Sequence, residues 1–182
     1  MDFEKVLPLI LNEFKRENVH YALMGGVAMS AWGVVRATVD LDYLVLAEDM
    51  EKIEKIMQKY GYQCIYKTEN VSQYRSDLKI YGSIDFLHAF RETARAMLER
   101  AVVKKVYNEQ YEVRVLCPED LVGLKVQAMV NDPEREMKEK ADIDSIAIAL
   151  GSQLDWKVIE DYYRMLNKSD DFEVLKRKYV TG

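Results

Sequence analysis

The chain has 182 residues, of which 49% are hydrophobic and 31% charged, and its formal net charge is −5. This length suits one compact domain with a sizeable interior, and the composition is typical of a soluble globular protein. The negative charge argues against a broad nonspecific nucleic-acid surface but is compatible with a local basic groove.

The cysteine count and the N-terminus both predict a cytoplasmic protein. Cys64 and Cys117 are too few for a disulfide framework, so we expect a reducing compartment. The first ten residues, MDFEKVLPLI, carry acids instead of a basic leader, and no apolar run reaches membrane-spanning length. We therefore expect no membrane partner.

Hydrophobic periodicity predicts a mixed first part and an all-helical second part. Helical spacing with Gly and Pro boundary signals predicts helices over 2–17, 26–32, 49–60, 91–101 and 118–130, one from beyond Pro133 to about Leu150, and helices over 154–166 and 170–179. Short apolar or alternating runs predict strands over 21–24, 39–46, 62–66, 72–80, 83–87, 102–107 and 111–116, with hairpin turns at Tyr81-Gly82 and Asn108-Glu109. The predicted fold class is α/β, of the α+β kind: a mixed sheet flanked by helices over 1–117, with a helical half over 118–182 packed on it as a single compact unit.

Asp40 and Asp42 are the first candidate site residues. They lie two apart in a predicted strand, and this spacing points both carboxylates to one face. Two such carboxylates repel each other and lose hydration on burial, so they need a shared proton or cation. Mg²⁺ or Mn²⁺ is the usual occupant of an all-oxygen site. The alternative is a solvated strand edge with two incidental acids, which the apolar run over 43–46 disfavours.

Gly25 and Gly26 stand where the strand over 21–24 meets the next helix. Bare backbone and unpaired N–H groups at such a turn can hold a phosphate, although paired glycines are more often plain turns. Ser30 lies one helical turn further on, where it faces either a phosphate or the interior. Together the glycines and the acids predict phosphoryl chemistry on a nucleotide.

Asp85, Thr38 and Arg36 complete the candidate set in the first part. Asp85 is a lone acid in an apolar strand, where an unpaired charge is costly, so it is either a third metal ligand and base or a core Asp with satisfied partners. Thr38 shares the parity of Asp40 and can contact phosphate or brace that acid. Arg36 is either a triphosphate ligand or an ordinary surface residue. His88 is favoured as a satisfied wall residue over a site residue.

These residues resemble the signature of the nucleotidyltransferase superfamily of DNA polymerase beta, a Gly-Gly or Gly-Ser pair followed by a carboxylate-x-carboxylate strand. Here thirteen residues separate Gly26 from Asp40. The sequence Arg36-x-Thr38-x-Asp40 is most similar to the branch of AbiEii-type toxins and small antibiotic-modifying enzymes. The resemblance implies that Asp85 helps to activate the attacking hydroxyl.

The resemblance also concerns the helical half. Lys125 resembles a lysine that AbiEii-like proteins place on the helix after the core, where it is expected to reach the nucleotide or the attacking group; the alternative is a solvated lysine. The segment with Lys138, Lys140, Asp142 and Asp144 resembles the helix whose acid orients that lysine, but Ala141 interrupts the usual pairing.

The predicted function is Mg²⁺- or Mn²⁺-dependent transfer of a nucleoside monophosphate from an NTP to a hydroxyl. The acceptor is left open among an RNA end, a protein and a small molecule, and a toxin-type enzyme with an antitoxin partner fits the resemblance. A second hypothesis is a degenerate nucleotide-binding regulator or toxin–antitoxin partner. A third, a purely structural domain, leaves the three acids without a shared task.

Overall fold

The computed structural model describes residues 1–107 and 109–180 and divides the chain into two compact units. Unit 1 comprises Met1–Ala31 and Arg36–Leu116, and unit 2 comprises Trp32–Val35 and Cys117–Gly182. The main division lies within one residue of the boundary expected at 117, but the assignment of Trp32–Val35 to unit 2 was not anticipated. That the two parts form a single compact unit stays a prediction.

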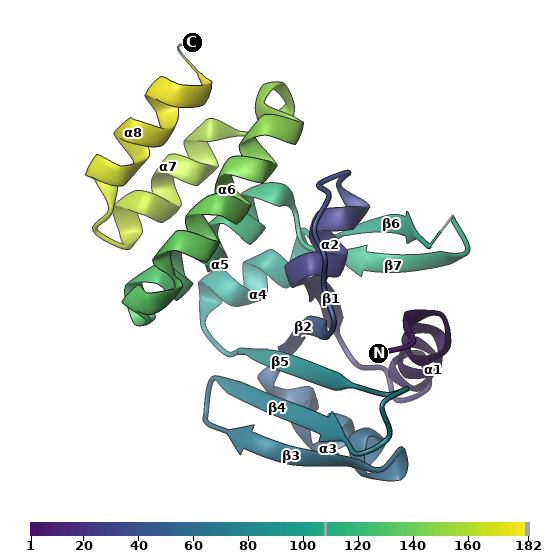
Figure 1. Cartoon of the computed structure of the whole chain (residues 1–182). Helices are drawn as coiled ribbons and strands as arrows, with labels where there is room; N and C mark the ends of the chain where they lie inside the picture. The colour runs from purple at the N-terminus through teal and green to yellow at the C-terminus, as the bar shows by residue number, and fades with distance from the viewer. Residues whose placement is uncertain (108, 181–182) are drawn as a thin grey trace. The chain divides into compact units, whose positions relative to one another are not determined.

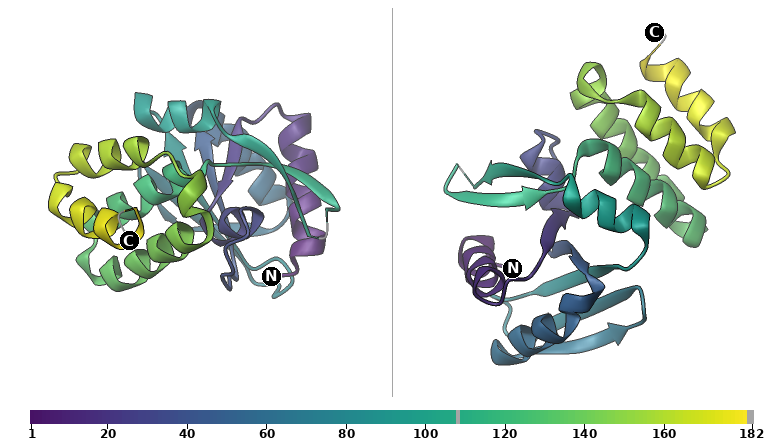
Figure 2. Two further views of the ribbon diagram at one scale, coloured as in Figure 1. Left: turned by 90° about the horizontal axis from the view of Figure 1, so that it is seen from above. Right: turned by 180° about the vertical axis from the view of Figure 1, so that it is seen from behind.

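Seven strands of the described part of unit 1 form one mixed sheet (Figure 1). The strands are β1 (Tyr21–Met24), β2 (Leu41–Leu46), β3 (Tyr62–Lys67), β4 (Val71–Ser76), β5 (Ser83–Ala89), β6 (Val102–Val106) and β7 (Tyr111–Val115), in the order β3-β4-β5-β2-β1-β7-β6. The β2–β5 and β1–β7 pairs are parallel and the other pairs antiparallel, which confirms the predicted mixed sheet. β6 and β7 extend as a ribbon at one end of the sheet (Figure 2), and Asn108 of their predicted turn lies outside the described residues.

Unit 1 also contains the helices α1 (Phe3–Arg16), α2 (Gly25–Ala31), α3 (Met50–Lys59) and α4 (Glu92–Glu99), and the short 3₁₀ helix η1 (Ala47–Asp49). α1 packs its Phe14 ring against Tyr43 and Phe86 of the sheet, at centroid distances of 5.3 and 6.4 Å. All three rings are fully buried. Leu44 has the opposite parity and is also fully buried, so both faces of β2 are covered at this level.

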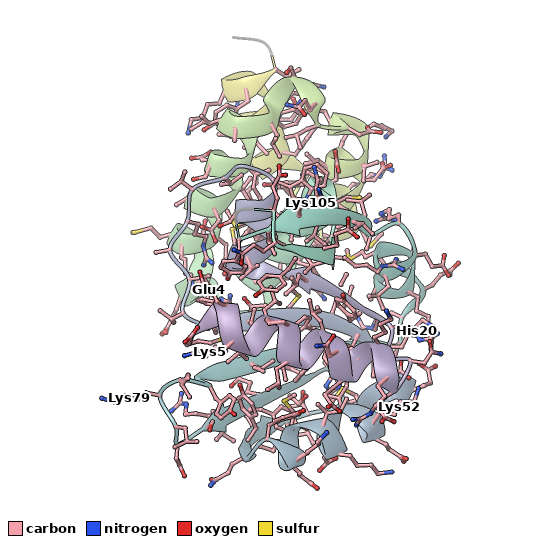
Figure 3. The ribbon with its side chains drawn as sticks, turned by 90° about the vertical axis from the view of Figure 1, so that its right-hand side faces the viewer. Glu4, Lys5, His20, Lys52, Lys79 and Lys105 are labelled. Atoms are coloured by element: carbon pink, nitrogen blue, oxygen red, sulfur yellow. The ribbon has the colours of Figure 1, made fainter. Side chains whose placement is uncertain are left out.

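Asp49 links the segment that follows α1 to the first turn of α3. It accepts hydrogen bonds from the His20 backbone N–H at 2.8 Å and from Lys52 Nζ at 2.6 Å, and it lies 3.0 Å from His20 Nδ1. Figure 3 shows His20 and Lys52 near the end of α1, whereas Glu4 and Lys5 lie at its start. A buried carboxylate with these donors is satisfied, so Asp49 serves the fold.

The β4–β5 hairpin differs from the prediction. β4 ends at Ser76, not near residue 80, because the chain turns earlier: the Ser76 N–H donates to the Gly82 carbonyl and the Tyr81 N–H to the Leu78 carbonyl. The connection is therefore longer than a tight turn at Tyr81-Gly82. The pairing register of the whole hairpin changes with it.

Unit 2 is helical, as predicted. It contains α5 (Pro118–Asn131), α6 (Glu136–Leu150), α7 (Trp156–Met165) and α8 (Ser169–Tyr179), with 3₁₀ turns η2 (Pro133–Arg135) and η3 (Gly151–Gln153). α5 and α7 approach closely at Gly123, where a Cβ would lie 2.8 Å from the ring of Tyr162. The Tyr162 hydroxyl donates to buried Asp120 at 2.7 Å. No helix in the described part of the chain is both long and apolar enough to cross a membrane.

Candidate active site

The site is built on the parallel pairing of β2 with β5. Asp42 is the register partner of Asp85, and the next pair is Tyr43 with Phe86. Because paired residues point to the same face and successive residues alternate, the two carboxylates share one face while the two rings stack at 5.7 Å on the other. The register therefore brings Asp42 and Asp85 together on one sheet face, as a shared site requires, and the convergence of Asp40 with them stays a prediction.

The same row continues onto β4. Gln73 pairs with Asp85 across the β4–β5 ladder, and its Nε2 donates to Asp85 Oδ2 at 3.0 Å. Arg75, two residues further along β4, points to the same face. Neither residue stands out in the sequence, because alternating polar residues in a strand are indistinguishable from a solvated face until the register is known.

Gly25 places the backbone directly against Asp42. It adopts a φ of +63°, and a Cβ there would lie 2.0 Å from Asp42 Oδ2. α2 begins at this residue, so the predicted strand-to-helix turn lies directly against the carboxylate. At Gly26 a Cβ would lie 2.7 Å from Arg36 Nη1 and 2.8 Å from Thr38 Oγ1. Asp42, Arg36 and Thr38 therefore lie against the backbone of the glycine pair, where any larger residue would clash with them.

The predicted start of the strand at residue 39, which would include Asp40, is wrong. β2 begins at Leu41, and no regular element is assigned over 34–40. The cause is the loss of a ladder partner: β1 pairs with β2 only as far as Met24 with Asp42, and then turns into α2. Thr38 instead donates from Oγ1 to Asp40 Oδ1 at 3.0 Å, a local bond that favours a turn over a strand.

Electrostatics nevertheless link Asp40 with Asp85. Burial raises the pKa of Asp85, the hydrogen bond from Gln73 lowers it, the charge of Asp40 raises it, and the charge of Arg75 lowers it. Over the residues that the structure describes, no group of three His, Cys, Asp or Glu side chains is arranged to hold a metal ion. Metal ligation by Asp40, Asp42 and Asp85 thus stays a prediction.

Ser30 and His88 have partners of their own. Ser30 is exposed, and its hydroxyl donates to the Gly26 carbonyl of the same helix at 3.0 Å. His88 is buried on the face opposite Asp85; its Nε2 lies 3.0 Å from Ser72 Oγ and its Nδ1 2.8 Å from the Glu69 carbonyl oxygen. His88 is therefore the satisfied wall residue that the sequence favoured, and a nucleotide contact of Ser30 stays a prediction.

Lys125 lies in unit 2, within an ion cluster of α5 and α6. Its Nζ is 3.0 Å from Glu139 Oε2 and 2.5 Å from Asp142 Oδ2, and all three side chains are nearly buried. Arg135 binds the other oxygen of Glu139. The alternative of a solvated lysine is therefore wrong. Asp142 does contact Lys125 despite the imperfect sequence pattern, whereas Lys138 and Lys140 take no part in this cluster.

Comparison with known proteins identifies the family. Residues 3–171 match a family described as uncharacterised nucleotidyltransferase. The chain belongs to this family. It is a nucleotidyltransferase by family, as the sequence predicted, and the match does not single out the AbiEii branch. No curated protein sequence matches the chain significantly.

Solved structures share the fold of this nucleotidyltransferase. The solution structure of the antibiotic-resistance factor ANT(2'')-Ia has a TM-score of 0.65 at 15% identity, with 100% of each chain covered. The lincosamide antibiotic adenylyltransferase LnuA has a TM-score of 0.53 at 14% identity, over 79% of this chain and 95% of that one. An antigenic nucleotidyltransferase-like protein from Paracoccidioides brasiliensis has a TM-score of 0.54 at 14% identity, over 95% and 91%.

The contact between Gly25 and Asp42 can be tested against Gly61, a glycine of similar backbone geometry. Gly61 has a φ of +71° but open space where a Cβ would stand. Gly61→Ala should therefore cost only the backbone strain of about 1 kcal/mol, whereas Gly25→Ala should cost a further 1–3 kcal/mol, roughly, because Asp42 must move. Urea unfolding of both variants measures the difference. Equal losses would contradict the contact.

His88 predicts a loss of stability on acidification. Burial lowers its pKa, so between the usual histidine pKa of about 6.5 and the folded value the unfolded chain binds the extra proton. The free energy of unfolding should fall as pH drops through this window, and His88→Gln should flatten the fall. Identical slopes for wild type and His88→Gln would refute the assignment.

The Lys125 cluster predicts a large, position-specific loss. Lys125→Met leaves Glu139 and Asp142 facing each other in a buried site, which should lower the free energy of unfolding by about 3–5 kcal/mol. Lys140→Met is the matched control, because Lys140 bridges Glu136 and Asp171 at the surface and should change stability by less than about 1 kcal/mol. Similar denaturation midpoints for the two variants would contradict a buried cluster.

Proposed function

We propose that this protein transfers a nucleoside monophosphate from an NTP to a hydroxyl group, with Asp42 and Asp85 at the centre of the site. Family membership supports the reaction class. The assignment of residues rests on the register of β2 and β5, which makes the two carboxylates neighbours on one face of the sheet. It is supported by the close approach of the Gly25 backbone to Asp42.

The nucleotide side of the site is the junction of β1, α2 and β2. Gly25 and Gly26 present backbone without side chains, which allows phosphate oxygens to approach closely. Arg36 borders Gly26 and supplies positive charge for a triphosphate. Thr38 holds Asp40 beside this junction.

The carboxylates fit a divalent cation shared with the nucleotide. Mg²⁺ usually keeps several waters and binds proteins through one or two carboxylates plus substrate phosphates, so a preformed cage of three protein ligands is not required. Asp42 and Asp85, adjacent on one face with Asp40 nearby, supply such a donor set. When bound, Mg²⁺ or Mn²⁺ would neutralise negative charge on the phosphates.

Asp85 takes the role of general base. It accepts the proton of the acceptor hydroxyl as the hydroxyl oxygen forms a bond to the α-phosphorus. The bond from the α-phosphorus to the bridging oxygen breaks, and pyrophosphate leaves with the electron pair. Gln73 donates to one Asp85 oxygen and so leaves the other free for the hydroxyl. Positioning and charge neutralisation supply most of the rate in such phosphoryl chemistry.

A small molecule is the acceptor that the structural neighbours favour. The structure of ANT(2'')-Ia with adenylyl-2''-tobramycin carries a nucleotide joined to an antibiotic, and that of LnuA has lincomycin bound. These neighbours share the fold at low identity, so they suggest the acceptor class and not the compound.

Asp42→Asn tests the site by removing one charge while keeping the side-chain shape. In EDTA the variant should melt as high as wild type or higher, because repulsion with Asp85 is relieved. Wild type should gain melting temperature with Mg²⁺ plus ATP, CTP, GTP or UTP, and the variant should lose that gain. Asp49→Asn is the structural control: it should melt lower in EDTA yet keep the nucleotide response. If Asp42 is only structural, Asp42→Asn should behave like Asp49→Asn: it should melt lower in EDTA and keep the nucleotide response.

Transfer of label from α-labelled NTPs into cell extract separates an enzyme from a degenerate regulator. An enzyme labels an acceptor and releases pyrophosphate, whereas a regulator binds Mg²⁺-nucleotide without doing either. Asp85→Asn should abolish transfer. Transfer that persists in this variant would remove Asp85 as the base.

A further inference from the structure

The sheet face beyond Asp85, over β4 and β3, is the part that the proposed nucleotide site does not occupy. Asp42 and the glycine turn occupy the β1 and β2 side of Asp85, where the proposed function places the nucleotide. On the other side lie β4 and then β3. In register with Asp85 are Gln73 of β4 and, next to it, Tyr66 of β3, a tyrosine that is 54% exposed.

On this face the strands β3, β4 and β5 carry a positive charge and no acid other than Asp85, and Asp77, just after β4, accepts a hydrogen bond from Gln63. The strands β3, β4 and β5, as described, contain Asp85 as their single acid and Arg75 and Lys67 as their cations. Lys67 is the register partner of Ser72, so its side chain lies on the face opposite Asp85. There Lys67 forms an ion pair with Glu54. Arg75 is thus the cation on the face of Asp85.

Arg75 is available to a ligand. It is exposed, and within the described residues its guanidinium has no hydrogen-bond or ion-pair partner. Arg75 pairs with Ser83, two residues before Asp85, so both side chains lie on one face of the sheet on adjacent strands. An arginine fork matches the geometry of phosphate and carboxylate oxygens, and an isolated one beside a reacting group is suited to hold such an anion.

We infer that Arg75 selects an acceptor that carries an anionic group, a phosphate or a carboxylate, near the hydroxyl that is to be modified. The inference rests on the proposed nucleotidyl transfer: the acceptor oxygen bonds to the α-phosphorus, its proton passes to Asp85, and pyrophosphate leaves. A polyamine acceptor would meet Arg75 as a like charge and would find no carboxylate on β3 or β4 to bind its ammonium groups. The anion could belong to a small metabolite or to the terminal phosphodiester of an RNA.

The first experiment offers the whole protein defined acceptor pools with Mg²⁺ and each α-labelled NTP. The pools are sugar phosphates with uronic acids, a short RNA with a free 3′ hydroxyl, neutral sugars, and the polyamine tobramycin. Label should enter the sugar-phosphate and uronic-acid pool or the RNA, and these two arms distinguish the sources of the anion. Label in neutral sugars or tobramycin would overturn the inference. So would no label in any pool while Mg²⁺-NTP still raises the melting temperature.

The second experiment assigns the selection to Arg75. Arg75→Glu should raise the KM for the labelled anionic acceptor roughly tenfold or more, with a smaller change in kcat, and Arg75→Lys should recover part of the loss. The nucleotide-induced melting shift should stay at the wild-type value in both variants. Lys79→Glu is the matched charge control, since Lys79 lies on the exposed connection after β4 and points away from the protein (Figure 3). It should leave the KM unchanged.

An unchanged KM in Arg75→Glu, or an equal rise in Lys79→Glu, would show that Arg75 is an ordinary solvated side chain. A wild-type protein that gains no melting temperature with any Mg²⁺-NTP would instead contradict the proposed function on which the inference rests. The two failures are therefore distinguishable.

Discussion

The parallel pairing of β2 with β5 ties the hydrophobic core of unit 1 to its candidate site. One step along the ladder joins Asp42 to Asp85, and the next joins Tyr43 to Phe86. The rings stack with each other and contact Phe14 of α1. Since a strand alternates its faces, every residue that fixes the aromatic pair in the core also fixes the carboxylate pair on the other face.

This coupling makes the position of the acids robust. Slipping β5 by one residue would turn Asp85 into the aromatic core and Phe86 out of it, and both changes are costly. The core therefore stabilises the only register that brings the two carboxylates together, although the carboxylates themselves repel each other. The β-bulge between Cys64 and Tyr66 lies in the edge strand β3, two strands away from this pair.

The sequence was sufficient for most elements because their hydrophobic patterns are local. It predicted the mixed sheet, the helical half and the strand-to-helix turn at Gly25-Gly26. It failed for Asp40, because the start of β2 is set by where its neighbour β1 turns away at Met24, which is not a local property.

The site residues on β4 were missed for a related reason. A tight turn at Tyr81-Gly82 would pair Asp85 with Leu78, whereas the longer connection after Ser76 pairs it with Gln73. Hence neither Gln73 nor Arg75 could be assigned to the site before the turn was known. Lys125 and Asp142 were suggested through resemblance, but their contact depends on how α5 and α6 pack, which their spacing alone does not fix.

Unit 2 needs a different means of fixing its geometry, because helices lack the backbone ladder that sets register in a sheet. Packing of apolar ridges tolerates rotation and sliding between helices more readily than a hydrogen-bonded ladder does. The Lys125 cluster restricts this freedom for α5 and α6, since sliding by one turn would separate a buried charge from its partners at a cost of several kcal/mol, roughly. The Tyr162 ring over Gly123 and its hydroxyl on Asp120 restrict α5 and α7 in the same way. Polar contacts within the helical unit thus supply the positional constraint that strand pairing supplies in the sheet.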